Sequence, residues 1–102
     1  MNLLTTGILQ SLPELGSTPD VLDPVVHVKF FTPDAGWTWY VTEGGRENDD
    51  VIFFGFVVGM CPEWGYFSLS ELKQIRGKLG LPVERDLYFE PRQFSQIKEV
   101  RQ

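Results

Sequence analysis

The sequence predicts an α+β protein in which short helices pack on an antiparallel β-sheet meander of about four to five strands. Two runs, residues 37–45 and 51–58, are rich in aromatic and β-branched side chains and are joined by a short polar segment, which is typical of a β-hairpin. A capping pattern at residues 68–71 precedes apolar residues at helical spacing. A chain of 102 residues holds one modest core, so residues 1–102 are predicted to form a single domain.

The N-terminal part is predicted to hold one short helix and a loop. Thr5 or Thr6 can cap a helix over residues 7–12, and Pro13 would end it. Residues 16–24 combine Gly, Ser, Thr, Pro and Asp, which indicates a loop that is too short to link two domains.

A strand is predicted over residues 25–31, and a turn over residues 32–36 returns the chain to the strand that begins at residue 37. Side chains alternate between the two faces of a strand. This alternation places Trp39 on an apolar face of the strand pair and Tyr40 on a mostly solvated face.

Residues 51–58 are apolar on both faces, which indicates an interior strand or one that helices cover. Gly55 within this run and Gly59 after it favour a bulge or a close approach of another backbone. Residues 59–65 are predicted to connect this strand to a fourth strand at residues 66–69.

The C-terminal third is predicted to hold two helices and a short strand. The capping pattern at Ser68 starts a helix whose apolar positions extend to Leu79, and residues 80–82 would end it. A short strand is predicted at residues 87–89, and Pro91 can open a terminal helix. The apolar positions of that helix would be Phe94, Ile97 and Val100.

Charge is unevenly distributed along the chain. The formal net charge is −5, and residues 14–50 carry eight acids against two bases, whereas residues 71–102 carry seven bases against five acids. We therefore expect one acidic side and one mildly basic side. Binding to duplex DNA is disfavoured because it needs many Lys and Arg side chains to displace counterions. An acidic surface suits a basic partner surface, and it also serves solubility alone.

The sequence disfavours export and membrane insertion. No basic segment followed by a long apolar run opens the chain, and the longest uncharged apolar stretch, residues 51–61, is about half of the ~20 residues that a membrane span needs. The single cysteine, Cys61, cannot form a disulfide within the chain, which fits a reducing cytosol. We expect a cytoplasmic protein.

No set of side chains predicts catalysis, and no cofactor or metal is expected. The only histidine, His27, belongs to no Ser-His-Asp pattern, and Cys61 has no neighbouring positive charge to activate it. Residues 47–50 lack the spacing of a calcium loop, and the glycines at residues 44–45 belong to no phosphate-binding motif.

Two further groups of side chains leave alternatives open. A metal-dependent hydrolase is a minor alternative because three carboxylates lie near a predicted strand. They are Glu84, Asp86 and Glu90. Three aromatic side chains are expected to be exposed and could stack on nucleobases, and packing in the core or contact with a partner is the alternative. They are Tyr40, Trp64 and Tyr66.

Five segments cover nearly the whole chain and carry a resemblance. They read VHVKFFTPD (residues 26–34), WTWYVTEG (37–44), FFGFVVG (53–59), GYFSLSEL (65–72) and LPVERDLYF (81–89). The chain resembles a family of short bacterial proteins of unknown function that are found on plasmids, integrative elements and prophages. That family is in turn similar to small anti-CRISPR proteins that inhibit type II effector nucleases.

The resemblance implies a protein that blocks a CRISPR-Cas type II effector nuclease by binding to it or to its ribonucleoprotein, without chemistry of its own. Such nucleases hold nucleic acid in positively charged channels, so acidic side chains are the candidates for partner contact. From charge and exposure alone, these candidates are Asp34, Glu43, Glu47, Asp49 and Asp50.

The alternative is a nucleic-acid-binding or partition accessory protein of a mobile element, with single-stranded DNA or RNA as its ligand. It would contact phosphates through the basic C-terminal part of the chain. The candidates are Lys73, Arg76, Lys78, Arg85 and Arg92. The sequence leaves the oligomeric state open.

Overall fold

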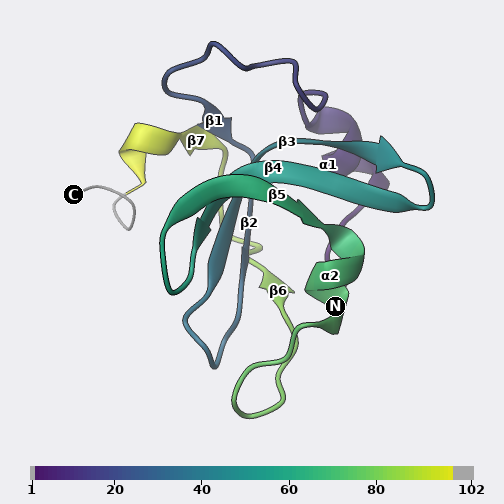
Figure 1. Cartoon of the computed structure of the whole chain (residues 1–102), viewed down its shortest axis with the longest axis vertical. Coiled ribbons are helices and arrows are strands. Elements are labelled where there is room, and N and C mark those ends of the chain that lie inside the picture. The colour runs from purple at the N-terminus through teal and green to yellow at the C-terminus, as the bar shows by residue number, and fades with distance from the viewer. Residues whose placement is uncertain (1, 98–102) are drawn as a thin grey trace.

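The structure is a computed structural model that describes residues 2–97, and it confirms the α+β class (Figure 1). Two short α-helices pack on a five-stranded antiparallel sheet, and two further strands form a small second sheet. In chain order the elements are α1 (Thr6–Ser11), β1 (Val25–Val26), β2 (Val28–Phe31), β3 (Thr38–Glu47), β4 (Asp50–Val58), β5 (Glu63–Ser68), α2 (Leu69–Gln74), β6 (Glu84–Arg85), β7 (Arg92–Gln93) and the 3-10 turn η1 (Phe94–Gln96).

The larger sheet has the strand order β5-β4-β3-β2-β6, so four consecutive strands form the predicted meander. The strand predicted over residues 25–31 is split at His27. Before this residue β1 pairs with β7, and after it β2 pairs with β3. The amide of His27 itself donates to the carbonyl oxygen of Val41 at 2.9 Å. One stretch of extended chain therefore joins the two sheets.

The β3–β4 hairpin is the longest pairing in the fold, and Asn48 adopts a φ of 58° in its turn. A β-bulge lies between Val41 and Glu43, where the register shifts opposite Gly55. A Cβ atom on Gly55 would overlap the carbonyl oxygen of Tyr40. The close backbone approach that the sequence predicts at this glycine is confirmed, and the interior position of β4 is confirmed as well.

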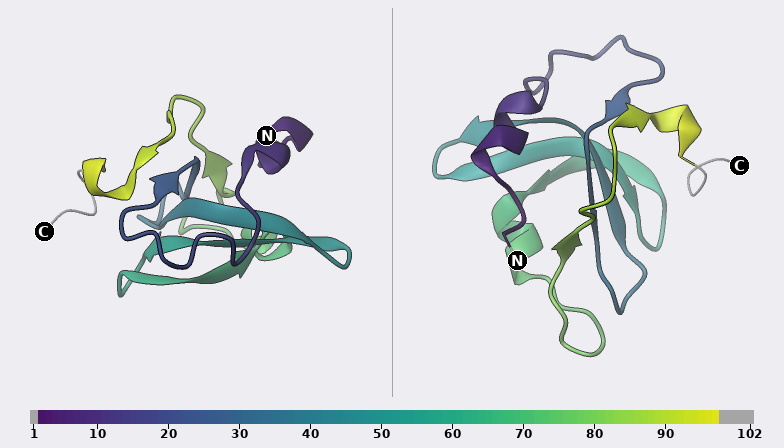
Figure 2. Two further views of the ribbon diagram at one scale, coloured as in Figure 1. Left: turned by 90° about the horizontal axis from the view of Figure 1, so that it is seen from above. Right: turned by 180° about the vertical axis from the view of Figure 1, so that it is seen from behind.

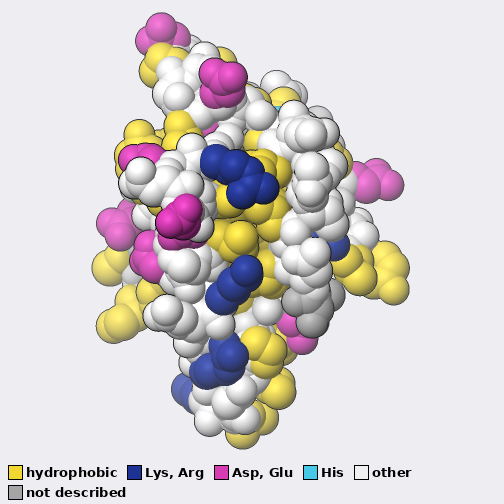
Figure 3. Space-filling view, turned by 90° about the vertical axis from the view of Figure 1, so that its right-hand side faces the viewer, with side chains coloured by type: hydrophobic (Ala, Val, Ile, Leu, Met, Phe, Trp, Pro, Cys, Tyr) yellow, Lys and Arg dark blue, Asp and Glu magenta, His cyan; other side chains and the backbone are white. Residues whose placement is uncertain are grey.

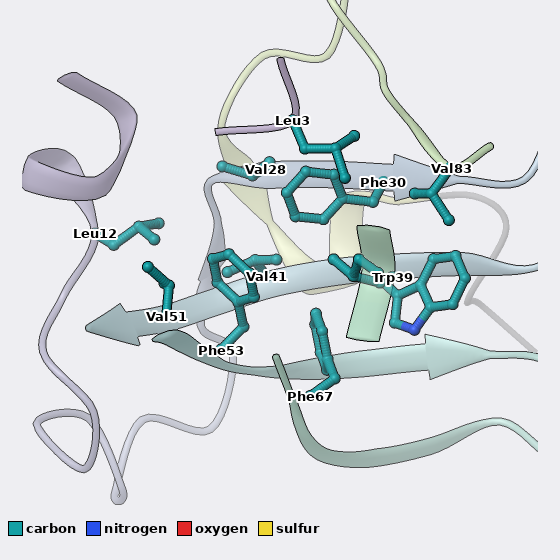
Figure 4. Packing of buried hydrophobic residues seen from close by; sticks show 11 residues of the cluster. Leu3, Leu12, Val28, Phe30, Trp39, Val41, Val51, Phe53, Phe67 and Val83 are labelled. Atoms are coloured by element: carbon teal, nitrogen blue, oxygen red, sulfur yellow. The ribbon is translucent and has the colours of Figure 1, made fainter. Parts of the chain in front are cut away.

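A hydrophobic core fills the face of the sheet that α1 and α2 cover (Figure 4). Phe53 on β4 lies at its centre, with ring centroids 5.6 Å from those of Phe30 on β2 and Phe67 on β5. Leu72 of α2 and Leu12 just after α1 close the cluster. Burying such side chains stabilises the fold by roughly 1.5–3 kcal/mol each.

The opposite face of β3 is also buried, which makes the prediction of a mostly solvated face wrong. Tyr40 is 1% exposed and packs in a second cluster with Val26 of β1 and Ile97. Phe89 and Phe94 add to this cluster from the C-terminal segment. The sequence alternation missed this cover because much of it comes from the C-terminal segment, which is far away along the chain.

The two helices begin where the sequence predicts. The Thr5 hydroxyl accepts from the amide of Ile8 at 3.1 Å and caps α1. Ser68 and Glu71 form the expected capping box at the start of α2. Helix α2 ends at Gln74, however, and Leu79 is 81% exposed, so the predicted extension to Leu79 is wrong.

The early end of α2 has a cause in the next loop. One carboxylate oxygen of Asp34 accepts from the amides of Leu79 at 2.7 Å and Leu81 at 3.3 Å. The carboxylate occupies the space beside Gly77 that a Cβ atom would take. This tertiary anchor, from the turn between β2 and β3, holds the chain in a loop instead of a helix.

Three other boundaries differ from the prediction. Strand β5 starts at Glu63, three residues earlier than expected. Residues 87–89 form a turn in which the Asp86 carboxylate accepts from the amide of Tyr88, so the strand predicted there is wrong. The terminal helix predicted from Pro91 is replaced by β7 and η1, and Val100 lies outside the described residues.

Helix α1 and the β7–η1 segment lie over opposite ends of the larger sheet (Figure 2). The Cα radius of gyration is 13.0 Å, which matches the ~13 Å of a compact chain of about 100 residues. Among residues 2–97, no helix is long and apolar enough to span a membrane.

Candidate functional site

The five acids named as partner-contact candidates do not form one face. Asp34 lies in the turn before β3, whereas Glu47, Asp49 and Asp50 lie at the far end of β3, in the hairpin turn and at the start of β4. The ten residues of β3 separate these ends by about 30 Å. Three of the five carboxylates also have partners within the chain.

Glu43 is 5% exposed and holds the N-terminal loop against β3. One of its carboxylate oxygens accepts from the amide of Gly16 at 2.7 Å. The other oxygen accepts from the amide of Thr18 at 3.1 Å and from the Thr18 hydroxyl. Hydrogen bonds to charged groups contribute about 1.5–3 kcal/mol, so Glu43 is a structural anchor of this loop.

Asp34 and Asp50 also hold other segments. Asp34 anchors the loop after α2, and its second carboxylate oxygen is buried without a hydrogen-bond partner among the described residues. Asp50 accepts from the hydroxyl of Ser70 at 2.5 Å and from the amide of Val51 at 2.8 Å. The Ser70 hydroxyl, followed by the Val51 amide, lowers the pKa of the Asp50 carboxyl.

The remaining two acids are presented to solvent. Glu47 is the last residue of β3 and Asp49 lies in the hairpin turn, and both side chains are exposed. They are the members of the candidate set best placed to meet a partner at the hairpin tip.

A more extensive aromatic feature lies across β4, β5 and η1, exposed at Trp64 and Tyr66 and half-buried at its other members. We call it the aromatic surface, and it consists of Phe54, Phe56, Trp64, Tyr66 and Phe94. The rings of Phe54 and Trp64 stack at 5.9 Å with an interplanar angle of 16°, and Tyr66 tilts against Phe54 at 4.9 Å. Antiparallel pairing places Phe54 opposite Tyr66 and Phe56 opposite Trp64, so all four side chains share one face.

Exposure separates the three aromatic residues that the sequence singles out. Tyr66 is 69% exposed and Trp64 is 40% exposed, so both can contact a ligand. Tyr40 is buried, and its predicted exposure is wrong because β1 and the C-terminal segment cover it.

The N-terminal loop and the aromatic surface enclose a hollow of about 450 Å³, which we call the aromatic hollow. One wall is the apolar loop, where Val21 is 50% exposed and Leu22 is fully exposed. The other wall is aromatic, and Glu43 lies between the two walls. The lining residues are Gly16, Thr18, Pro19, Val21, Leu22, Pro24, Thr42, Glu43, Phe54, Trp64 and Tyr66.

A second, basic hollow of about 560 Å³ lies beside α2. Lys73, Arg76 and Glu84 supply its charged side chains. On this face, Lys and Arg side chains run in a column beside apolar ones, with Asp and Glu gathered along one side (Figure 3). Of the sequence-predicted basic candidates, Lys73 and Arg76 lie together at this hollow.

Several bases on this side have structural partners. The Arg76 guanidinium donates to the carbonyl oxygens of Lys73 and Ile75 at the end of α2. The Arg85 guanidinium donates to the carbonyl oxygens of Asn2 and Leu3 and ties down the N-terminal segment. A further candidate, Arg92, packs over the ring of Phe89 at 4.9 Å.

The residues weighed for catalysis are dispersed. His27 is half-buried, and burial lowers its pKa. Cys61 is exposed in the turn between β4 and β5. Asp86 forms an ion pair with Lys29 at 3.8 Å. Within residues 2–97, no group of three or more His, Cys, Asp or Glu side chains is placed to hold a metal ion.

Fold and surface together define a small α+β protein with an exposed aromatic hollow. The chain belongs to the family described as protein of unknown function (DUF2958), whose model matches residues 3–99. No curated protein and no solved structure matches the chain.

Sequence reasoning missed most of the aromatic hollow. Trp64 and Tyr66 were identifiable as aromatic residues, but Phe54 and Phe56 belong to a strand whose pattern indicates burial on both faces. The alternation of Trp64 and Tyr66 from Glu63 onward is the signal that places both rings on one face of β5. No local sequence pattern predicts the wall formed by the N-terminal loop, because the residue that holds this loop, Glu43, is about 25 residues away along the chain.

Proposed function

We propose that this protein is an anti-CRISPR inhibitor of a mobile element or phage. In this proposal it binds a type II RNA-guided nuclease, or its ribonucleoprotein, in the cytoplasm of a bacterial host and performs no chemistry. The observation that carries the proposal is the exposed aromatic hollow, whose walls contain apolar and aromatic side chains and one carboxylate. The nuclease is the proposed partner because the five segments described above resemble a family that is similar to anti-CRISPR proteins.

The aromatic hollow has the properties of a protein-contact surface. Tyr66, Trp64, Val21 and Leu22 expose large apolar side chains in one place. Contiguous exposed apolar patches mark interaction sites, and aromatic residues are enriched in protein–protein interfaces. A rigid sheet supports one wall, so little conformational entropy is lost when a partner binds.

Acidic side chains supply the complementary charge. The net charge of −5 favours approach to the positively charged channel in which such a nuclease holds nucleic acid. Glu47 and Asp49 at the hairpin tip add exposed negative charge. Their contribution is expected mainly in the association rate, because rim charges act chiefly by steering.

The test is cleavage of target DNA by a panel of guide-loaded type II effector nucleases, with and without a molar excess of the purified protein. We expect lowered cleavage by at least one member of the panel and co-elution of the protein with that nuclease in size-exclusion chromatography. Full cleavage throughout the panel, with no complex, would contradict the proposal.

The basic face favours one second candidate, a nucleic-acid-binding accessory protein of a mobile element. Lys73 and Lys78 are both exposed. A column of Lys and Arg side chains runs along one face of the molecule (Figure 3). This function predicts binding to single-stranded DNA or RNA that weakens steeply as salt is raised. A fluorescence anisotropy titration at low and high salt measures it, with the Lys73→Gln and Lys78→Gln double variant as the weakened comparison.

A further inference from the structure

We infer that the aromatic hollow receives an arginine side chain presented by the partner protein. The inference rests on the proposed function because it takes the partner to be a protein with a basic surface. It adds the chemical group of the partner that the aromatic hollow recognises. Three features of the aromatic hollow support it: its aromatic wall, its carboxylate and the absence of Lys and Arg among its lining residues.

The aromatic wall suits a guanidinium group. Phe54 and Trp64 are stacked nearly parallel, at 16°, and Tyr66 is tilted by 58° against Phe54. Arginine has a planar, weakly hydrated cation that stacks on aromatic faces, and such a contact contributes on the order of 0.5–2 kcal/mol as desolvation increases. The opposite wall, with Val21 and Leu22, offers apolar contact to the aliphatic part of the same side chain.

Glu43 supplies the anion. Glu43 is 5% exposed, and its carboxylate accepts three hydrogen bonds, all from the neutral donors of Gly16 and Thr18. None of these donors carries a positive charge. An ionised carboxylate offers about four lone-pair sites and three hydrogen bonds are made here, so the remaining site is assigned to the incoming cation.

The surroundings of the aromatic hollow favour a cation over a phosphate. One wall comes from residues 16–24 and the other from residues 54–66. These walls belong to two long stretches, residues 1–28 and 47–72, in which the sequence has no Lys or Arg. No Lys or Arg is among the residues that line the aromatic hollow, so a phosphate group there would meet Glu43 without a compensating base. A nucleic-acid backbone is therefore disfavoured even though the aromatic rings could stack on bases.

Arginine fits this combination better than lysine. A lysine ammonium is a compact and strongly hydrated charge, and it would lose more hydration in an apolar hollow. The guanidinium can place one N–H group on the Glu43 carboxylate while its flat face lies on the aromatic wall. The partner is therefore expected to present an exposed arginine from its own basic surface.

The experiment is an NMR titration of the isotope-labelled protein with an alternating glycine–arginine peptide. A second peptide has citrulline, which keeps the shape of arginine without its charge, and a third has lysine. We expect the arginine peptide to shift the indole N–H signal of Trp64 and the amide signals of Gly16 and Thr18. Binding of the citrulline and lysine peptides should be at least tenfold weaker.

Two matched variants test the location. Leu22 is fully exposed, so Leu22→Lys adds a positive charge at the mouth of the aromatic hollow without removing a packed side chain. It should weaken binding of the arginine peptide at least tenfold. Leu79→Lys makes the same change at an exposed leucine on the loop after α2 and should leave binding unchanged.

Equal binding of the arginine and citrulline peptides would overturn the inference, as would shifts confined to other surfaces or no shifts at millimolar peptide. Equal binding of the lysine peptide would overturn the choice of arginine. The titration contains no nuclease, so its outcome is separate from that of the cleavage assay. Arginine binding without nuclease inhibition would support the aromatic hollow as an arginine-binding site and would reject the nuclease as the partner.

Discussion

Individual residues at the β3–β4 pairing decide whether the bulge and the N-terminal loop can form. Gly55 lets the backbone of β4 approach Tyr40 at the bulge, and Glu43 projects from the bulged strand to hold Gly16 and Thr18. Gly55 pairs with Val41 and Glu43 pairs with Phe54, so Gly55 and Glu43 lie at neighbouring positions of the β3–β4 pairing. Together they link the bulge to the loop that forms one wall of the aromatic hollow.

Gly55→Ala is predicted to destabilise the protein strongly. The new Cβ atom would overlap the carbonyl oxygen of Tyr40, and because backbone atoms must then move, the free energy of unfolding should fall by about 3 kcal/mol or more. The control is Gly65→Ala on the paired position of β5, where the Cβ atom would meet open space. Urea unfolding measures both variants, and equal stability of the two would contradict the account of the bulge.

Glu43→Gln is predicted to loosen the N-terminal loop. The amide keeps the size of the side chain but loses the charge-assisted hydrogen bonds, at a cost of about 1.5–3 kcal/mol. Hydrogen exchange should show faster exchange at the amides of Gly16 and Thr18. Glu47→Gln, an exposed change on the same strand, is the control. Unchanged exchange in the Glu43 variant would show that the loop is held by other contacts.

His27 makes stability depend on pH. Burial lowers the pKa of His27 below its ordinary value of 6.5, so the unfolded chain binds a proton more readily than the folded protein does. Stability should therefore fall as the pH decreases through 6.5 toward the folded pKa. Because this is the only histidine, His27→Gln should lose less stability between neutral and mildly acidic pH than the wild type, as measured by urea unfolding.

Single elements show where sequence patterns succeed. The starts of α1 and α2 are predicted correctly because their caps are local: Thr5 reaches Ile8, and Ser68 and Glu71 satisfy each other. The end of α2 is predicted incorrectly because Asp34, more than forty residues away, captures the following loop. Local side-chain hydrogen bonds are visible in a sequence, and long-range ones are not.

Ser68→Ala is predicted to weaken α2 at its start. The variant removes the hydroxyl that accepts from the amide of Glu71, which leaves a helical donor unsatisfied and lowers the free energy of unfolding by about 1 kcal/mol. Ser17→Ala, an exposed serine outside the helices, is the comparison. Thermal unfolding measures the difference, and equal midpoints would mean that the capping box contributes little.

Over the whole molecule, the sequence predicts the α+β class, the meander and the hairpin, because each depends on periodicity and turn residues within one segment. The candidate site is less predictable. Trp64 and Tyr66 stand out in the sequence, but the aromatic hollow also needs a distant loop and a buried glutamate to hold it. Of the acids proposed from charge alone, Asp34 lies before β3, Glu43 lies within it, and the other three lie at its far end. The aromatic hollow forms only when the chain is folded.

The most direct test of the account is the dose dependence of nuclease inhibition in the cleavage assay, measured for wild type, Tyr66→Ala and the Glu47→Gln, Asp49→Asn double variant. Tyr66 is largely exposed, so its truncation leaves the core intact. The account predicts that Tyr66→Ala raises the half-inhibitory concentration at least tenfold, whereas the hairpin-tip variant changes it by less than that. Undiminished inhibition by Tyr66→Ala would contradict the claim that this protein acts through its aromatic hollow.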